Sequence, residues 1–444
     1  MVGASLVVSF AAQRSARAER NPIAFNASGF DPDKAQFSLL AVSLGTESVD
    51  MLAGHVMVRV KQDDLDYTFD WGNYNAKKSG FVINYIKGDI SFEHQVRPIA
   101  STIKSYKKEN RQVLEYPLQL TREQKARVLA TFVEWAKPER RVYHYDFALE
   151  NCSTAIRDIL GTAIGPQFKA FYERPAQQTY RSIGMPYFYN FPVVLPLAEL
   201  GLGAPTDRAL QNWDLFFLPL VGFEQYRASP AYDDGGNPMP DSHLLGEPTV
   251  LNPGQHAEIG KVRWSMLYGA LLSLLALGGT GLRYLRRTDP LAAPYKVGTY
   301  ALGGALMVTG WFFGLLSMLF IAIWTATAHR LAFQNYNLAF LWPTDLALVA
   351  IAWRLIRHDR YASQPQTSRA LVGYFGLHLA VGTLVALGSL VSVVPQDVRV
   401  ASLLSLPLWL ALFVDSLTRL TQAAPARPNP PAFDPESQVQ SPST

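Results

Sequence analysis

The sequence has a single cysteine among 444 residues, and this scarcity limits its chemistry. One thiol excludes an internal disulfide and any zinc site made of several thiolates. No cluster of histidine, aspartate and glutamate has convincing ligand spacing either, so we expect no metal and no other cofactor. Cys152 itself has two interpretations: a small buried side chain, or the nucleophile of a thiol enzyme.

Charge is the second scarce feature, since charged residues make up 17% of the chain and the formal net charge is +4. A balance this mild and dispersed excludes a typical nucleic-acid-binding surface. Beyond about Val262, long uncharged apolar stretches alternate with short basic loops. Because 444 residues also exceed one ordinary hydrophobic core, we expect two structural regions.

These patterns divide the chain into four segments. Residues 1–22 are a signal-peptide remnant or an N-terminal anchor, because an apolar run precedes the small-x-small triplet Ala16-Arg17-Ala18. Residues 23–262 are an α+β domain, and residues 263–420 are an all-α transmembrane region of about five helices. Residues 421–444 are rich in proline and serine and are expected to be a disordered tail.

Basic residues orient the predicted transmembrane helices. The spans are expected at residues 264–282, 297–328, 340–353, 370–394 and 400–417. Arginines are concentrated in the loops after the first and third spans, whereas the opposite loops carry only Arg330 and Arg399. The positive-inside rule places the arginine-rich loops in the cytoplasm, so the α+β domain lies outside it.

Three predicted strands organise the start of this domain, at residues 37–42, 55–60 and 65–71. The polar residues 61–64 have the length of a hairpin loop. If Val60 pairs with Leu65, the antiparallel register places His55 directly opposite Asp70 on one face of the sheet.

Two helix starts are visible further along the chain. Thr121 is expected to cap one helix. The other begins near Asn151 and is expected to stop at Gly161. Cys152 then lies in the first helical turn, where unpaired N–H groups and the positive end of the helix dipole favour a thiolate and could stabilise an oxyanion.

A thiol nucleophile requires a base, and three histidines compete for that role. They are His55, His94 and His144, and from the residues alone each is better explained as a structural histidine. The preference for His55 as the base includes the family resemblance given next. His144 lies in Tyr143-His144-Tyr145-Asp146-Phe147, which has the pattern of a partly buried structural segment. Asp70 is expected to orient His55, although Tyr67 or a backbone carbonyl could accept the same N–H.

Four segments form a recognisable set: Gly54-His55-Val56-Met57-Val58-Arg59, Tyr67-Thr68-Phe69-Asp70-Trp71-Gly72, Tyr143-His144-Tyr145-Asp146-Phe147 and Asn151-Cys152-Ser153-Thr154-Ala155-Ile156-Arg157-Asp158. They resemble the Lnb family of bacterial lipoprotein N-acyltransferases. Further matches are residues 111–121, Thr206-Asp207-Arg208 and Asn335-Tyr336-Asn337-Leu338. The chain departs from the family pattern in its N-terminus and in Trp342-Pro343-Thr344, where an Asn-Pro step is expected.

The resemblance implies a circularly permuted papain-like (NlpC-like) domain, because the histidine precedes the cysteine. It also implies an activity in the bacterial inner membrane, on diacylglyceryl lipoproteins and membrane lipid. Cys152 would take an acyl chain from a glycerol ester as a thioester, with His55 as base. The N-terminal amine of the lipoprotein would then accept the chain, leaving a lyso-form product.

Six further residues are expected to bind substrate. Arg111 and Arg208 could bind a phosphate or carboxylate, or form structural salt bridges. The others are Asn151, at the helix start, and His329, Asn335 and Asn337, in a loop on the same side as Cys152. These last three could instead cap helices or bind interfacial water.

Two other functions remain open at this level. A membrane-anchored cysteine peptidase or amidase acting on cell-wall peptides would use the same cysteine and histidine. It would not account for the membrane region, since an anchor needs one span. A non-catalytic membrane scaffold would have no reactive thiol.

Overall fold

The structure is a computed structural model that describes residue 25 and residues 27–74, 79–358 and 365–422. The predicted N-terminal segment lies outside these residues, as does the predicted tail apart from Thr421 and Gln422. The chain forms two compact units. Unit 1 comprises Met1–Tyr268, Ser317–Leu338 and Val385–Ala401, and unit 2 comprises Gly269–Leu316, Ala339–Leu384 and Ser402–Thr444.

Unit 1 is built on a seven-stranded antiparallel sheet with the strand order β6-β4-β3-β2-β1-β5-β9. The three predicted strands are confirmed at the centre of this sheet. The strands are β1 (Gln36–Val42), β2 (His55–Gln62), β3 (Leu65–Asn73), β4 (Ser91–Pro98), β5 (Val113–Pro117), β6 (Val142–His144) and β9 (Thr249–Asn252). A separate two-stranded sheet pairs β7 (Pro230–Tyr232) with β8 (Pro238–His243).

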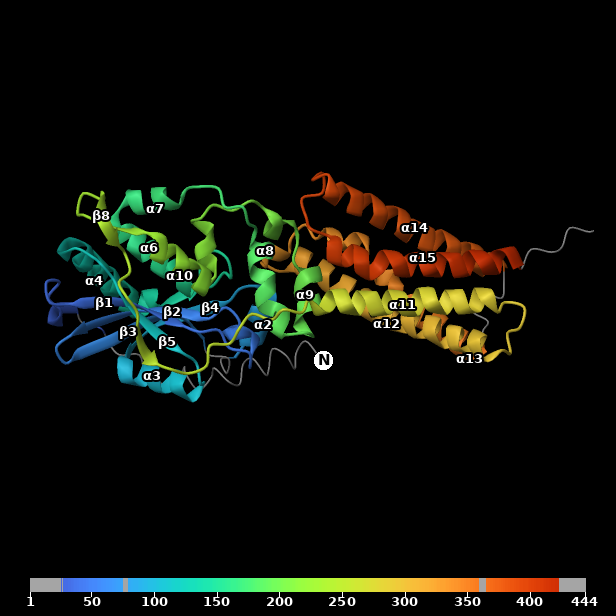
Figure 1. The fold of residues 1–444 in the computed structure, drawn as a ribbon, viewed down its shortest axis with the longest axis horizontal. Coiled ribbons are helices and arrows are strands. Elements are labelled where there is room, and N and C mark those ends of the chain that lie inside the picture. The colour runs from blue at the N-terminus through green and yellow to red at the C-terminus, as the bar shows by residue number, and fades with distance from the viewer. Residues whose placement is uncertain (1–24, 26, 75–78, 359–364, 423–444) are drawn as a thin grey trace, which may run out of the picture. The chain divides into compact units, whose positions relative to one another are not determined.

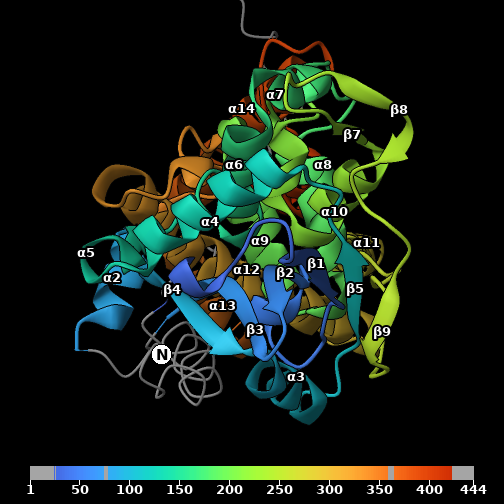
Figure 2. The ribbon, with the colours of Figure 1, turned by 90° about the vertical axis from the view of Figure 1, so that its left-hand side faces the viewer.

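Helices cover both faces of the large sheet (Figures 1 and 2). On one face, alternate residues of β2 pack in a core with α4 (Arg122–Ala136), α6 (Cys152–Ile164) and α10 (Pro219–Ala228); this core includes Val56, Val58, Val60, Phe132, Ile156, Leu160 and Phe223. On the other face, Met57 packs with Tyr106 of α3 (Ile99–Lys108). The period-two alternation of β2 therefore gives each face its own core.

The β2–β3 register differs from the predicted one by two residues. Val60 pairs with Tyr67, and Gln62 pairs with Leu65, so the turn contains only Asp63 and Asp64. Polar Lys61 and Gln62 continue the strand beyond the core, because strand pairing needs only backbone groups there. A shift of two residues keeps each side chain on its face of the sheet, so the predicted proximity of His55 and Asp70 survives the wrong register.

The predicted helix starts are confirmed, but one predicted end is wrong. Thr121 and Gln124 form a reciprocal capping box at the start of α4, an arrangement that stabilises a helix by ~1 kcal/mol. Helix α6 continues through Gly161 to Ile164, and Gly165 follows with a φ of 117°. Gly161 packs closely within the helix, since a Cβ there would lie 3.3 Å from the Trp213 ring.

Shorter helices complete the N-terminal part of unit 1. They are α2 (Phe81–Lys87), α5 (Pro138–Arg141), α7 (Pro166–Tyr172), α8 (Tyr180–Gly184) and α9 (Val194–Gly201). A satellite core under these elements includes Leu52, Tyr180, Tyr187, Leu215 and Phe217. It supports the chain that follows α6.

Within the described residues, four helices are long and apolar enough to cross a membrane. They are α11 (Trp264–Leu285), α12 (Ala293–Ala326), α14 (Pro365–Leu390) and α15 (Arg399–Gln422). The third predicted span, at residues 340–353, is not one continuous helix. Its segments bend by 61° at a break before Pro343, and α13 (Ala347–His358) has only 12 residues. Trp342 is extended (φ −120°, ψ 147°), as a residue before proline tends to be.

Glycines and a buried charge pair hold the helices of unit 2 together. Gly279 of α11 packs against α12 so closely that an added Cβ would lie 2.9 Å from the Gly298 carbonyl oxygen. Arg283 Nε binds Asp415 Oδ1 at 3.1 Å, and both side chains are buried. Small residues at helix contacts and paired charges are typical of membrane helix packing.

Two loops predicted to lie on the same side of the membrane as the α+β domain do contact that domain. The loop after α12 lies on the α+β domain, since Asn335 Nδ2 donates to the Leu200 carbonyl at 2.7 Å. The loop before α15 does the same, since Gln396 Nε2 donates to the Leu202 carbonyl at 3.1 Å. The two loops that carry Arg330 and Arg399 therefore lie on the side of Cys152.

Candidate functional site

Cys152 is the first residue of α6, and its position is fixed by the preceding asparagine. Asn151 Oδ1 accepts hydrogen bonds from the N–H groups of Ser153 at 2.9 Å and Thr154 at 3.1 Å. The Asn151 N–H donates to Thr154 Oγ1 at 2.8 Å. The prediction that Cys152 lies in the first turn is thus confirmed, but two of the N–H groups expected to face it are already bound by Asn151.

Gly72 of β3 lies beside both members of the expected catalytic pair. A Cβ added at Gly72 would lie 3.7 Å from Cys152 Cβ and 3.9 Å from His55 Cε1. The thiol-bearing residue and the imidazole are therefore neighbours of the same backbone position. Gly72 has a φ of 89°, a conformation that glycine adopts without strain.

Asp70 binds the histidine from the next strand. Its Oδ1 lies 2.6 Å from His55 Nε2, and both side chains are buried. Its Oδ2 accepts a hydrogen bond from Arg97 of β4. The Asp70 carboxylate is thus held from both sides, and a line of polar groups crosses three strands and ends at His55.

The surroundings of His55 favour its charged form. Burial alone would lower its pKa, but the electrostatic effects of Tyr106, Cys152 and Asp70, with the hydrogen bond to Asp70, outweigh burial and raise the pKa from 6.5 to about 10. An imidazolium here would lie beside the thiol and the carboxylate. This is the electrostatic arrangement of a thiolate–imidazolium pair.

The two rival histidines have other surroundings. His94 is buried against Phe69 and Trp71, with ring centroids 5.9 and 4.5 Å away. Burial lowers its pKa to about 4. His144 is half exposed at the edge strand β6 and lies 3.6 Å from Asp89, whereas Tyr143, Tyr145 and Asp146 beside it are partly buried, as predicted for this segment. His55, by contrast, shares Gly72 with Cys152 as a close neighbour.

The arginines and Asn151, predicted to bind substrate, are engaged by the protein. Asn151 Nδ2 donates to the carbonyls of Phe147 and Phe217, both at 2.9 Å. Arg111 is buried and donates twice to the Ser43 carbonyl, from Nε at 2.8 Å and from Nη2 at 2.6 Å. Asn151 and Arg111 therefore use their side-chain donors to bind backbone carbonyls of neighbouring segments.

Arg208 is the more accessible of the two arginines. It is half exposed, and its Nη2 donates to the Tyr180 hydroxyl at 2.8 Å and lies 3.2 Å from Asp214 Oδ1. The neighbouring Thr206 and Asp207 both bind the buried Arg181. A structural salt bridge, one of the two predicted possibilities, is thus present at Arg208.

The loop after α12 carries three residues predicted to bind substrate, and all three contact other elements of unit 1. Asn335 and Asn337 are buried, and each donates to the Leu200 carbonyl near the end of α9. His329 Nε2 lies 3.0 Å from the Tyr85 carbonyl of α2. All three therefore bind helix ends, which is the alternative to substrate binding that the sequence left open.

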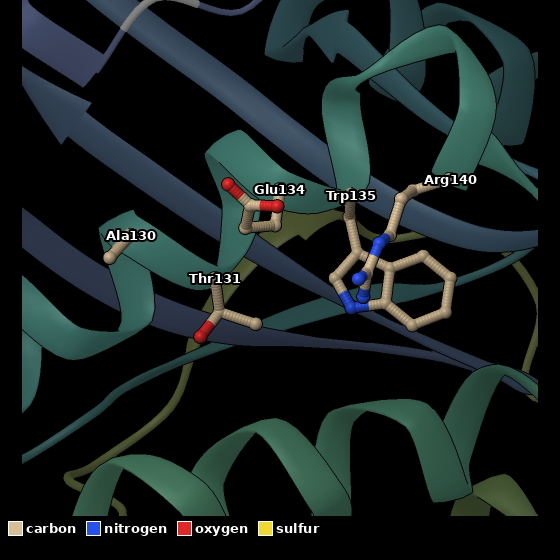
Figure 3. Close-up of a pocket in the computed structure, with 5 residues that line it drawn as sticks. All are labelled: Ala130, Thr131, Glu134, Trp135 and Arg140. Atoms are coloured by element: carbon tan, nitrogen blue, oxygen red, sulfur yellow. The ribbon is translucent and has the colours of Figure 1, made fainter.

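A surface hollow of about 300 Å³ lies elsewhere, at the end of α4 (Figure 3). Its lining consists of Ala130, Thr131, Glu134, Trp135 and Arg140. Neither Cys152 nor His55 belongs to this lining, so the hollow is separate from the site described here.

One functional contact, that of Arg97, was not predicted from the sequence. This residue follows the strand positions that pair with Asp70, since Asp70 pairs with Gln95 on β4. The alternation of buried Phe92, His94 and Val96 was a usable sign of this strand. It would have placed Arg97 on the face opposite to that core.

Comparison with known proteins adds one finding. Residues 24–184 match the family model of the Lnb N-terminal periplasmic domain. The resemblance to the Lnb family is confirmed. The matched residues include His55, Asp70, Gly72 and Cys152. The match supports a lipoprotein-processing, Lnb-like enzyme with a periplasmic N-terminal domain and membrane-spanning helices. No curated protein and no solved structure matches the chain.

Proposed function

We propose that this Lnb-like chain is a cysteine-dependent lipoprotein N-acyltransferase. One observation carries the proposal: Cys152, at the start of a helix, and His55, bound to Asp70, both lie against Gly72. The family match at residues 24–184 supports lipoproteins as the substrates. The order of the two residues, with the histidine strand before the cysteine helix, is the basis for assigning a circularly permuted papain-like domain to residues 23–262.

In the first step, the Cys152 thiolate attacks an acyl ester carbonyl of the diacylglyceryl group. Because Asp70 holds His55 Nε2, the ring nitrogen that receives the thiol proton is Nδ1. The C–O bond of the ester then breaks, and His55 returns the proton to the glycerol oxygen. The products are a thioester on Cys152 and a lyso-lipoprotein.

In the second step, the N-terminal amine of the lipoprotein attacks the thioester. His55 takes the amine proton as the new amide bond forms. The C–S bond breaks, and the thiolate is regenerated beside the imidazolium. The net reaction moves one acyl chain from a glycerol oxygen to a nitrogen, without an oxidant, a metal or water.

Stabilisation of the two tetrahedral intermediates falls to the start of α6. Asn151 binds the N–H groups of Ser153 and Thr154, so we assign the oxyanion contact to the backbone N–H of Cys152. Asn151 is a positioning residue in this mechanism. Its contacts with the Phe147 and Phe217 carbonyls keep the first turn in place.

The location of the reaction follows from the membrane helices. We propose a multi-pass protein of the bacterial inner membrane, with residues 23–262 in the periplasm and residues 263–420 as the transmembrane region. The domain then works beside the lipid-anchored N-terminus of its substrate. The acyl donor in this proposal is the lipoprotein itself.

Mass spectrometry of a lipoprotein N-terminus tests the proposal. The chain is expressed in a bacterium that lacks N-acylation, and a reporter lipoprotein is analysed. We expect one amide-linked acyl chain and one fewer ester-linked chain. Cys152→Ala and His55→Ala should each abolish this product. The matched control His144→Ala should retain it, because His144 is half exposed and lies beside Asp89 at the sheet edge.

The alternatives give different products. A peptidase would cleave a peptide bond and leave the acyl chains unchanged. If labelled phospholipid supplies the chain, the donor is separate and the intramolecular version is wrong. Unchanged N-acylation with Cys152→Ala would end the assignment of the nucleophile.

A further inference from the structure

Helix α2 presents large apolar side chains to the outside of unit 1. Ile83 and Ile86 are 59% and 54% exposed, and their spacing of three residues places them on one side of the helix. Phe81 and Tyr85, on the other side, pack against the small core around Tyr74. The exposed side of α2 thus mixes these two isoleucines with the polar residues Asn84 and Lys87, where a water-facing helix would carry polar residues alone.

A second apolar element precedes the nucleophile. Phe147 and Leu149 are 46% and 43% exposed in the turn that leads to α6. The turn is closed by two backbone hydrogen bonds between Asp146 and Glu150, both 3.1 Å long. Asp146 Oδ1 also accepts hydrogen bonds from the N–H groups at positions 148 and 149. The exposed side chains are therefore held outward by a well-bonded turn.

These two elements touch each other and reach the site. The ring of Tyr85 packs edge-on against Phe147, with centroids 6.4 Å apart. The Phe147 carbonyl binds Asn151, the residue that caps the cysteine helix. The contact between Tyr85 and Phe147 therefore links α2 to the turn before α6. We call the four exposed apolar residues of these two elements, Ile83, Ile86, Phe147 and Leu149, the apolar rim.

The rim is also attached to the outer end of a membrane-spanning helix. Helix α12 ends at Ala326, and two residues later the N–H of Ala328 donates to the Lys87 carbonyl of α2 at 2.7 Å. His329 adds its contact with the Tyr85 carbonyl. The end of a span lies at the boundary of the bilayer, so these bonds hold α2 at that boundary.

We propose that the apolar rim is immersed in the acyl chains of the periplasmic leaflet and delivers an ester-linked chain to Cys152. The delivery role rests on the proposed function, whereas the immersion does not. Transfer of exposed apolar side chains beside a span from water into lipid lowers the free energy. In this arrangement the scissile ester reaches the thiol without the chain crossing water.

Site-specific fluorescence tests the immersion. Because Cys152 is the only cysteine, Cys152→Ala gives a background in which Ile83→Cys carries one environment-sensitive dye. In lipid nanodiscs we expect blue-shifted emission and strong quenching by lipids that carry a nitroxide on the acyl chain. The matched control is Glu224→Cys, whose native side chain is 63% exposed on α10. Its emission should be water-like and only weakly quenched.

Other occupants of the rim would give different signals. Water-like emission at position 83, equal to that of the control, overturns the proposal. Blue-shifted emission without quenching by lipid nitroxides also overturns it, because the rim would then be covered by protein. Both readings are independent of acyl transfer, so they separate failure of the rim from failure of the proposed function.

An activity measurement tests delivery. Ile83→Gln/Ile86→Gln keeps good helix formers on α2 and should lower N-acylation at limiting lipoprotein by about tenfold. Labelling of Cys152 by a small water-soluble thiol reagent should be unchanged. Val250→Thr, at a residue that is 59% exposed on β9, is the control and should retain full activity. Full activity of the double variant would contradict delivery by the rim.

Discussion

Each unit of the protein contains a buried histidine–aspartate pair, and the two pairs differ in what surrounds them. In unit 1, His55 Nε2 lies 2.6 Å from Asp70. In unit 2, His378 Nε2 lies 3.2 Å from Asp345, and both side chains are fully buried. The residue types and the burial are therefore shared, so neither can by itself define a catalytic site.

The second pair is enclosed by aromatic rings. His378 stacks on Trp342 and Trp409, with centroid distances of 3.7 and 4.2 Å. Asp345 accepts hydrogen bonds from the Tyr374 hydroxyl at 2.6 Å and from the backbone N–H of Trp342 at 2.8 Å. This pair fixes the broken segment before α13, whereas the first pair has a thiol at a helix start as its neighbour. A thiol at a helix start is therefore what distinguishes the candidate active site from the second histidine–aspartate pair.

The largest expected difference in N-acylation rate comes from replacing each of the two histidines by alanine. His55→Ala should lower N-acylation about 10³-fold, because it removes the proton acceptor of the thiol. His378→Ala should leave the rate per folded molecule within about twofold while lowering thermal stability, because it empties a packed aromatic site. Both rates are measured by mass spectrometry and normalised to monomeric folded protein. A loss of similar size in both variants would break the distinction between the pairs.

A smaller effect is expected from Asp70→Asn, which should reduce the rate about 10²-fold because an amide holds His55 without stabilising its charge. The same change alters the pH dependence of stability. The raised pKa of His55, from 6.5 to about 10, stabilises the fold fully below pH 6.5, and this contribution is lost as pH rises through 10.

Thermal melting from pH 6 to pH 10.5 checks this sign. The wild-type advantage over Asp70→Asn should be largest at the acid end and shrink towards the alkaline end. An advantage that grows with pH would mean that His55 is neutral in the folded protein.

The smallest effect is expected at Arg97, which acts through Asp70. Arg97→Met should lower the rate about tenfold and shift alkylation of Cys152 to higher pH, because a buried cation that supports the anionic groups is lost. Arg97→Lys should recover part of both. A purely structural role would lower melting temperature without moving the alkylation profile.

The sequence was sufficient for the parts of the fold that depend on local pattern. Strand alternation placed His55 and Asp70 on the same face even though the register was wrong by two residues, because side-chain direction repeats every two residues. The capping residues Thr121 and Asn151 were readable for the same local reason. Pro343 signalled the break in the third predicted span, but apolar composition outweighed it there.

Contacts between distant segments were not readable. Asn335 binds a carbonyl 135 residues away, so the sequence could not tell a helix-end contact from a substrate contact. Arg97 is 27 residues from Asp70 and belongs to β4, a strand that was not among those predicted. Arg111 and Arg208 were ambiguous because an arginine binds a carboxylate, a phosphate or a carbonyl with the same donors.

The central claim is that Cys152 carries the acyl chain, and intact-protein mass spectrometry tests it most directly. The purified chain, mixed with a diacylglyceryl lipopeptide whose N-terminal amine is blocked, should gain the mass of one acyl chain. That mass should map to Cys152, disappear with hydroxylamine and be absent from Cys152→Ala. Acyl transfer to an unblocked lipopeptide by Cys152→Ala, or an acyl group found on another residue, would contradict the account.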